Sequence, residues 1–255
     1  LFKKRILMPE YLELLILFGV GVIAGVINIM AGGGSSLTLP ALIFLGLDSA
    51  TANGTNRVGI LIQSIFATLS FRNEKITGLN LSLRLAAFTI PGAILGALLA
   101  VRMTDKWFEI ILGVIMIGII FTMLIPQSKN LVTSDQGQKT WLVYPAMFAI
   151  GFYGGFIQVG VGFLIMAALY HLMRMNLVFV NMHKVFITLI FTIPALLIFM
   201  WTDNVDWLLG LVLAAGNAVG GWWSARISVR GGEKVIRYIM IVAIFIIALK
   251  LFGLF

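Results

Sequence analysis

The sequence predicts an all-helical membrane protein that crosses the bilayer many times and is built from two inverted repeats. Composition predicts the membrane, because 60% of the 255 residues are hydrophobic and only 11% are charged. The mean hydropathy of +1.06 lies far above that of an ordinary globular domain. The recurrence of the same sequence blocks in both halves predicts the repeat. A single secretory signal cannot account for so much apolar sequence.

Ten apolar segments follow a short interfacial lead-in at residues 1–9. Several have roughly 20 residues or more, enough to cross a hydrocarbon layer about 30 Å thick at about 1.5 Å per residue. In chain order they cover 11–31, 35–47, 51–71, 79–102 and 105–125, then 141–159, 162–173, 177–201, 207–228 and 232–252. The second segment of each set is too short for a comfortable perpendicular span. We therefore expect one transmembrane domain with a first repeat at 1–125, a connecting loop at 126–140 and a second repeat at 141–255.

Three blocks recur in the same order in the two halves, with one two-residue length difference placed at the break after the first block. They are GVGVIAGVIN ending at Asn28 and AIGFYGGFIQ ending at Gln158, ATANGTN ending at Asn56 and VFVNMHK ending at Lys184, and PGAILGALLAVR ending at Arg102 and AGNAVGGWWSAR ending at Arg226. Five crossings per unit is an odd number, so the second unit must insert upside down, which predicts a 5+5 inverted repeat. If the short segments only dip and return, the halves would instead be parallel.

Glycine and serine interrupt the first half at MAGGGSSLTLP, residues 30–40. Backbone groups freed inside hydrocarbon need partners, so this break must line a cavity or be packed within protein. Ser35 and Ser36 are typical of a capped helix start, where free N–H groups and the helix dipole attract anions. VGVGF at 159–163 occupies the same place in the second half. Two such ends meeting in mid-membrane predict a binding site, and tight packing of small residues is the alternative.

Four glycine pairs with GxxxG spacing are interpreted differently from the breaks. They are expected to mark close helix packing within or between the repeats, and not ligand contacts. The pairs are Gly21 and Gly25, Gly92 and Gly96, Gly151 and Gly155, and Gly216 and Gly220.

Polar side chains recur at matched positions near the breaks. Asn53 and Asn56 share one helix face, as do Asn181 and Lys184. An ammonium inside an apolar segment costs about 3 kcal/mol on insertion scales, so Lys184 is expected to face the interior and meet an anion. The alternative is a side chain that snorkels to the headgroups, and Arg57 has the same two interpretations.

The charges and the missing cysteines exclude several function classes. No carboxylate lies deep in a segment, which disfavours a cation cage or an acidic proton relay. Cysteine is absent, so thiolate metal sites and cysteine nucleophiles are excluded. The net charge of +8 comes mainly from basic residues in short connections, where anionic lipid and the positive-inside rule explain them better than nucleic acid does. By the positive-inside rule, the basic residues of most connections favour an orientation with both termini outside the cytoplasm, whereas KKR at 3–5 favours the opposite orientation.

Longer stretches around the breaks resemble a known family. GVINIMAGGGSSLTLPALIFLG followed by ATANGTNRVGILIQSIFATLSF resembles the TauE/SafE-type sulfite exporter and permease family, and GFYGGFIQVGVGFLIMAALYHL with VFVNMHK is similar to its second half. The resemblance covers nearly the whole chain. It implies a bacterial or archaeal inner-membrane carrier of small sulfur-containing anions such as sulfite or organosulfonates. It also implies functional glycine motifs at residues 32–36 and at 160 and 162, and polar helix motifs that include Lys184.

The sequence therefore predicts a multi-pass secondary anion transporter of the cell inner membrane, with no enzymatic activity, cofactor or metal. The expected partners are a small anion, the lipid bilayer and a coupling proton or ion; nucleic acid is not expected, and an oligomer is compatible. A passive anion channel is the alternative, whereas no HExxH, nucleophile elbow or carboxylate pair supports an intramembrane enzyme. His183 is either a proton or hydrogen-bond carrier or a structural residue. The candidate substrate-binding residues are Asn28, Gly32, Gly33, Gly34, Ser35, Ser36, Asn53, Asn56, Gln158, Gly160, Gly162, Asn181, His183 and Lys184.

Overall fold

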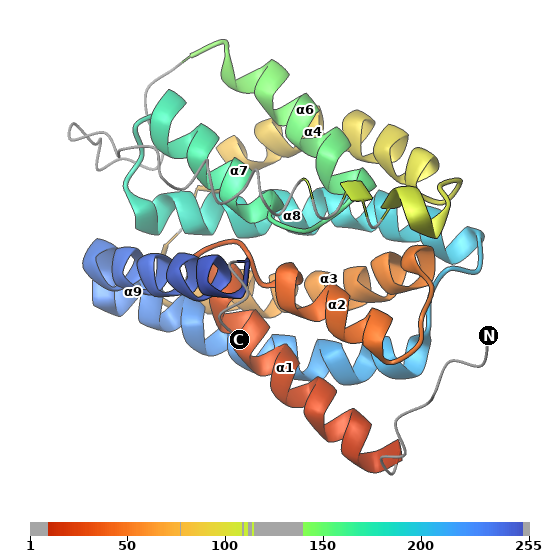
Figure 1. Ribbon diagram of the computed structural model, residues 1–255. Coiled ribbons are helices and arrows are strands. Elements are labelled where there is room, and N and C mark those ends of the chain that lie inside the picture. The colour runs from red at the N-terminus through yellow and green to blue at the C-terminus, as the bar shows by residue number, and fades with distance from the viewer. Residues whose placement is uncertain (1–9, 77, 109, 112–113, 115–139, 252–255) are drawn as a thin grey trace.

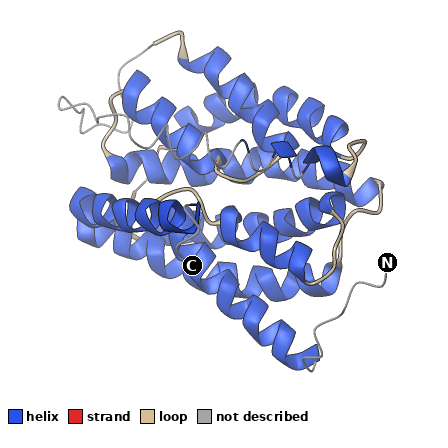
Figure 2. Ribbon diagram, viewed as in Figure 1, coloured by secondary structure: helices blue, strands red, loops and turns tan. Residues whose placement is uncertain are grey.

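The computed structural model describes residues 10–76, 78–108, 110–111, 114 and 140–251. These residues form helices joined by short connections, with no strand among them (Figure 2). The helices are α1 (Glu10–Met30), α2 (Ser35–Phe44), α3 (Ser49–Asn73), α4 (Leu79–Ala100), α6 (Val143–Phe156), α7 (Val161–Ala167), the π-helical turn η1 (Ala168–Leu172), α8 (Leu177–Trp201) and α9 (Trp207–Leu251). α9 is two helices joined at a kink, where Gly232 has a φ of 64°. Most of the predicted segment 105–125 and the predicted loop up to residue 139 lie outside the described residues.

The helices correspond closely to the predicted apolar segments. Within the described ranges, four helices are long and apolar enough to cross a membrane: Tyr11–Met30, Leu79–Ala100, Leu177–Trp201 and Trp207–Gly232. α3 is as long as α8, with 25 residues, but it is less apolar because it carries a row of buried polar side chains. α2, α6 and α7 with η1 are shorter apolar helices. The short second segment predicted in each half is confirmed.

The described helices form two bundles, one above the other in Figure 1. The first bundle contains α1, α2, α3 and α9, and the second contains α4, α6, α7 and α8. α4 and α9 are exchanged between the halves of the chain, because α4 packs on α6 and α9 packs on α1. α3 and α8 form the main contact between the bundles. Each bundle therefore contains helices from both halves.

Glycines allow the exchanged helices to approach closely. A Cβ at Gly21 would lie 2.9 Å from the carbonyl oxygen of Leu213 on α9, and a Cβ at Gly96 would lie 2.7 Å from the backbone nitrogen of Phe156 on α6. Comparable backbone contacts surround the other members of the four GxxxG pairs. Their predicted role in close packing is confirmed, and the contacts join the two halves.

Backbone conformations recur at one fixed separation along the chain. Asp48 caps α3 by accepting from Thr51 N, and Asn176 caps α8 by accepting from Val178 N. Left-handed φ angles recur at the same separation in the pairs Gly32 and Gly160, Gly46 and Arg174, and Lys75 and Asp203. α4 and α9 also start at this separation, but their glycine pairs are displaced by one helical turn. The predicted alignment, with a single length difference at the break, is therefore wrong. Aligning the glycine pairs of α4 and α9 requires a second length difference of one helical turn. A shift of about one full turn leaves the glycines on the same helix face.

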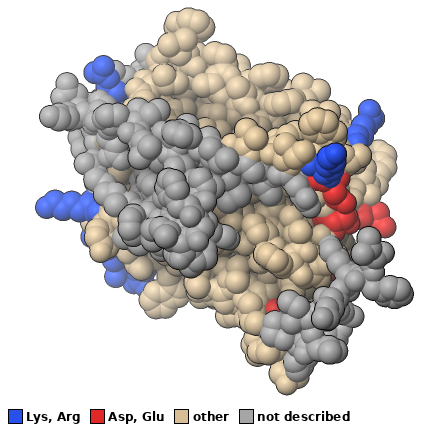
Figure 3. Space-filling model, in the orientation of Figure 1, with Lys and Arg blue, Asp and Glu red and all other residues tan. Residues whose placement is uncertain are grey.

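The matched helices α3 and α8 run in opposite directions. Gly54, near the start of α3, packs against Phe199, near the end of α8. Phe71, near the end of α3, clusters with Met182 and Val185, near the start of α8. In Figure 3 the visible charged side chains lie mainly at the two ends of this helix direction, and the described surface between them is largely uncharged. This is the distribution expected of a surface that faces lipid.

Candidate functional site

The two predicted breaks lie against each other between the bundles. Gly32 has a φ of 92° and Gly160 a φ of 73°, values that side-chain-bearing residues rarely adopt. A Cβ added at Gly32 would collide with the backbone of Gly162, and the converse is also true. Gly33 lies against the ring of Phe163, and Gly34 against α1. Glycine is thus required where the two breaks pack against each other, because the backbone of one break contacts the backbone of the other there. We call this contact the crossing of the breaks.

A small cavity adjoins this crossing, with walls from both bundles. Its volume, measured as the space open to the centre of a water molecule, is about 20 Å³, which is room for one or two waters. Polar and apolar groups share the lining. The lining residues are Asn28, Ile29, Ser35, Ile60 and Ser64 from the first bundle, and Gln158, Val161, Gly162, Lys184, Val185 and Thr188 from the second.

Lys184 reaches across the cavity edge from α8 to the end of α1. Its Nζ donates to the carbonyl oxygens of Asn28 at 3.0 Å and Ile29 at 2.5 Å, and to Oδ1 of Asn181 at 3.0 Å. The two carbonyls belong to the last turn of α1, the negative end of its dipole, which favours a cation. The side chain is 2% exposed, so the predicted interior position is confirmed and snorkelling is excluded. Its three protons all have oxygen acceptors in this conformation.

Arg57 makes the equivalent contact on α6. Its Nη1 donates to the carbonyl oxygen of Gly154 at 3.0 Å and its Nη2 to that of Gly155 at 2.6 Å, both in the last turn of α6. The guanidinium also contacts Oδ1 of Asn53 at 3.4 Å and Oε1 of Gln158 at 3.2 Å. It is fully buried, and its Nε has no hydrogen-bond partner among the described residues. Of its two predicted interpretations, the structure selects the interior one.

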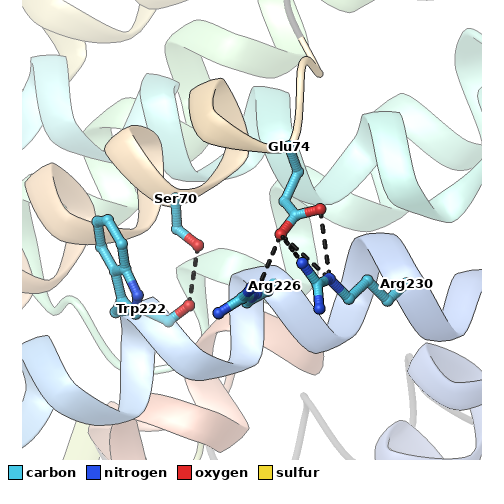
Figure 4. Close-up of polar contacts among 5 residues, drawn as sticks. All are labelled: Ser70, Glu74, Trp222, Arg226 and Arg230. Atoms are coloured by element: carbon cyan, nitrogen blue, oxygen red, sulfur yellow. Dashed lines mark hydrogen bonds and ion pairs between the residues drawn. The ribbon is translucent and has the colours of Figure 1, made fainter.

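The buried cations differ from the exposed ones in their partners. Arg226 and Arg230, near the end of the first part of α9, both pair with Glu74 at the end of α3, at 3.1 Å and 3.0 Å (Figure 4). Within the described part of the chain, the hydrogen bonds of Lys184 and Arg57 instead go to neutral oxygen acceptors, with a weaker contact from Lys184 to a methionine sulfur. Among the described residues, the partners of these two buried positive charges are therefore neutral groups, which offer dipoles and no opposite charge.

Amide side chains extend the polar network on both sides of the crossing. Asn28 donates through Nδ2 to Oε1 of Gln63 at 3.1 Å, and Gln63 donates to the carbonyl of Gly25 at 3.0 Å. Gln158 donates through Nε2 to Oγ1 of Thr192 at 2.9 Å. These bonds connect one lining residue of the cavity in each bundle, Asn28 and Gln158, to further polar groups of the same bundle.

Three other predicted amides lie next to the cavity lining. Asn53 donates to the carbonyl of Phe156 at 2.8 Å, and Asn56 accepts from Oγ1 of Thr38 at 2.6 Å. Nδ2 of Asn56 is buried and has no partner in the part of the chain that the structure describes. Asn181 holds the Lys184 amine and donates to Ser228 at 3.4 Å.

One sequence prediction is wrong, and one of the two interpretations of His183 fits its position. The predicted serine cap is wrong, because Gly34 is the N-cap of α2 and makes no side-chain cap bond, and Oγ of Ser36 donates back to the carbonyl of Gly33 at 2.7 Å. The tight turn at this start already uses the backbone N–H of Ser36. His183 lies against α4, where its Nδ1 is 2.7 Å from Oγ of Ser82. It does not line the cavity, as its structural interpretation expects, because successive helical residues point about 100° apart.

The cavity brings together some of the predicted site residues and adds others. Predicted residues in its lining are Asn28, Ser35, Gln158, Gly162 and Lys184. The predicted residues outside its lining are Gly32, Gly33, Gly34, Ser36, Asn53, Asn56, Gly160, Asn181 and His183. Ser64 and Thr188 were missed by sequence reasoning. Helical spacing could have found them, because Thr188 lies one turn beyond Lys184 and Ser64 lies two turns beyond Asn56.

Comparisons with known proteins agree on one family. Residues 17–251 match the family model described as sulfite exporter TauE/SafE. The chain is 30% identical over 252 residues to the probable membrane transporter protein YfcA of Escherichia coli K12, covering 97% of this chain and 93% of that protein. It is 29% identical to the probable membrane transporter protein ORF9 of Sinorhizobium sp, covering 92% and 90%, and 24% identical to the probable membrane transporter protein YunE of Bacillus subtilis 168, covering 94% and 97%. No solved structure matches significantly.

Proposed function

We propose a specific transport activity for this chain, which belongs to the sulfite exporter TauE/SafE family. It is a multi-pass membrane protein, and its relatives are named as membrane transporters, not as enzymes. In a bacterium its place is the inner membrane. The proposed activity is secondary transport of a small sulfur-containing anion, sulfite or an organosulfonate, through the cavity between the bundles.

One observation carries this proposal: the Lys184 ammonium is buried at the cavity, and its partners are neutral. A cation taken out of water loses hydration that neutral carbonyls replace only in part. An anion in the cavity would supply the missing negative charge at hydrogen-bond distance. The hydroxyls of Ser35, Ser64 and Thr188 add donors that suit sulfite or sulfonate oxygens.

The size of the cavity supports a moving site. Space for one or two waters is smaller than a sulfonate needs, so the bundles must separate to admit the anion. The cavity lies where they meet, and one of its lining residues, Lys184, donates hydrogen bonds across this boundary to backbone carbonyls of α1. We infer an alternating-access cycle in which one bundle moves against the other and opens one side at a time.

We also propose the 5+5 inverted repeat, with halves at 1–125 and 141–255. The recurrence of caps and left-handed residues at one separation supports it, as do the opposite directions of α3 and α8. The exchange of α4 and α9 between the bundles is consistent with a two-fold relation in the membrane plane.

Transport into proteoliposomes tests the proposal. We expect labelled sulfite or taurine to accumulate above its equilibrium level when a proton gradient is imposed, because a carrier can couple one flux to the other. Lys75→Gln, which removes an exposed cation, should transport like wild type, whereas Lys184→Gln should transport labelled sulfite with a raised KM. Flux that never exceeds equilibrium would favour a passive anion channel, and no flux of any tested anion would contradict the proposal.

A further inference from the structure

Arg57 is a second buried cation that the proposed function does not use. Its exposed fraction is 0%, and the ring of Phe199 lies 4.7 Å below the guanidinium carbon. Its oxygen acceptors in the described structure are two backbone carbonyls and two amide oxygens, all neutral. Its Nε is buried and meets no acceptor from residues 10–76, 78–108, 110–111, 114 or 140–251. Arg57 therefore has both unbalanced charge and a spare donor.

Arg57 and Lys184 lie on opposite sides of the cavity along the membrane direction. Arg57 lies about two turns from the start of α3, and Lys184 about two turns from the start of α8. Because α3 and α8 are antiparallel and pack together along their lengths, the two cations are separated by roughly 15 to 20 Å along the helix axes. The cavity residues Ile60, Ser64 and Thr188 come from the middle of the same helices.

Gln158 links Arg57 to the cavity. A guanidinium has only donors, so it fixes Oε1 of Gln158 toward itself and turns the amide NH₂ away, toward Thr192. Gln158 is itself part of the cavity lining. One side chain thus separates the second cation from the space in which the anion is proposed to bind.

Each cation also joins the two bundles. Arg57 belongs to the first bundle and holds the end of α6 in the second, whereas Lys184 belongs to the second bundle and holds the end of α1 in the first. Separating the bundles on one side would break only the bonds on that side. The released cation could then bind an anion that enters from that side.

We propose that Arg57, with Asn53 and Gln158, forms a second anion-binding position on the side of the cavity opposite Lys184, and that a transported anion contacts the two cations in turn. This inference rests on the proposed function. When the first and second bundles separate at the α6 end, the anion replaces the carbonyl oxygens of Gly154 and Gly155 as partner of the guanidinium. When they separate at the α1 end, Lys184 exchanges its carbonyl partners in the same way.

Side-specific transport kinetics test this position. Right-side-out and everted membrane vesicles present opposite faces of the protein to the medium. Thr202 directly follows α8, whose end lies beside the start of α3. Because the sequence has no cysteine, labelling of Thr202→Cys by a membrane-impermeant maleimide identifies the face at which α3 starts. For labelled sulfite we expect Arg57→Gln to raise KM by about tenfold from that face and by less than about twofold from the other face. Lys184→Gln should show the opposite asymmetry. A merely structural cap on α6 would alter both faces alike.

A substrate-independent measurement follows the opening itself. Val161→Cys places a thiol in the cavity lining. Adding Arg57→Gln should increase its labelling by an impermeant reagent from the face at which α3 starts, and adding Lys184→Gln should increase it from the other face. Equal increases from both faces would contradict the assignment of Arg57 to one side.

The outcomes separate the two proposals. If the wild-type chain moves no sulfite or sulfonate, the proposed function fails. If wild type transports normally and Arg57→Gln changes KM equally from both faces, or not at all, only the second position is overturned. Where Arg57→Gln does not insert into the membrane, Arg57→Lys decides: it keeps the charge but loses the two-pronged geometry, so a smaller asymmetry in the same direction is expected.

Discussion

In both halves of the chain, a buried cation donates to backbone carbonyls at the end of the helix before the break, but the cation is a different residue in each. The last turn of α1 receives the amine of Lys184, and the last turn of α6 receives the guanidinium of Arg57. In both, an asparagine on the same helix as the cation also accepts from it: Asn181 for Lys184 and Asn53 for Arg57. The geometry is repeated although the cations are not at matched sequence positions.

The difference lies in which cation touches the cavity. Lys184 lines it, whereas Arg57 reaches it only through Gln158. Asn56, which matches Lys184 in the repeat, contacts Thr38, just as Lys184 contacts the matched Met166. The two halves therefore share contacts more closely than charges: one half places a cation in the cavity lining, and the other places a cation behind Gln158.

The largest expected effect comes from removing the cavity cation. Lys184→Ala should weaken sulfite binding by about 100-fold, because the buried site loses its only direct positive charge among the described lining residues. Lys184→Arg should also bind more weakly, since a planar fork cannot reproduce the three bonds of the amine. Titration calorimetry on purified protein measures both. Wild-type affinity in Lys184→Ala would remove Lys184 from the site, with Lys75→Ala as the exposed control.

The next effect concerns the crossing of the breaks. Gly32→Ala should lower the free energy of unfolding by about 3 kcal/mol or more. Alanine is strained at the left-handed φ of this position, and its Cβ would also collide with the backbone of Gly162. Gly46→Ala is the matched control: its φ is 100°, but nothing lies within 4 Å of the added Cβ, so only the backbone strain of about 1 to 2 kcal/mol applies. Thermal unfolding in detergent compares them. Equal losses would indicate that the two breaks do not pack as described.

A smaller effect on function is expected at His183. Its ring lies against Ser82 on α4, away from the cavity. His183→Ala should therefore leave sulfite affinity within about twofold of wild type and leave the pH dependence of uptake unchanged, although it lowers stability. Uptake measured between pH 5 and pH 8 tests this. A flattened pH profile would restore His183 as a proton carrier.

The smallest effect is expected at the surface pairs of Glu74. Glu74→Gln should lower the stability of the α3–α9 contact by about 0.5 to 1 kcal/mol, because Arg226 and Arg230 are 45% and 58% exposed. Thermal unfolding should show the difference from wild type shrinking as salt is added. A salt-independent loss as large as that of Gly32→Ala would contradict the contrast between exposed and buried cations.

Hydropathy predicted most of the helices, whereas their partners depended on three-dimensional packing. The boundaries predicted for α8 agree with the structure, because a long apolar run with polar flanks has one favourable solution in a bilayer. GxxxG spacing identified the packing faces but not the exchange of α4 and α9, since the motif carries no information about which helix it meets.

The candidate site was predicted less completely than the fold. Lys184 was found because a charge in an apolar run is conspicuous, and the glycines because they interrupt it. Arg57 was left outside the site because repeat matching selected its neighbour Asn56. The serine cap was wrong because Gly34 itself adopts helical φ and ψ and starts the helix. Such local choices depend on neighbouring atoms that no sequence spacing reveals.

A structure of the protein with bound sulfite would show whether the cavity between the bundles is the binding site. We expect the anion between the two bundles, next to Ser35 and Thr188, with at least one bond from Lys184 Nζ transferred from the α1 carbonyls to a sulfite oxygen. Sulfite bound elsewhere, with Nζ still held by the carbonyls of Asn28 and Ile29, would contradict it.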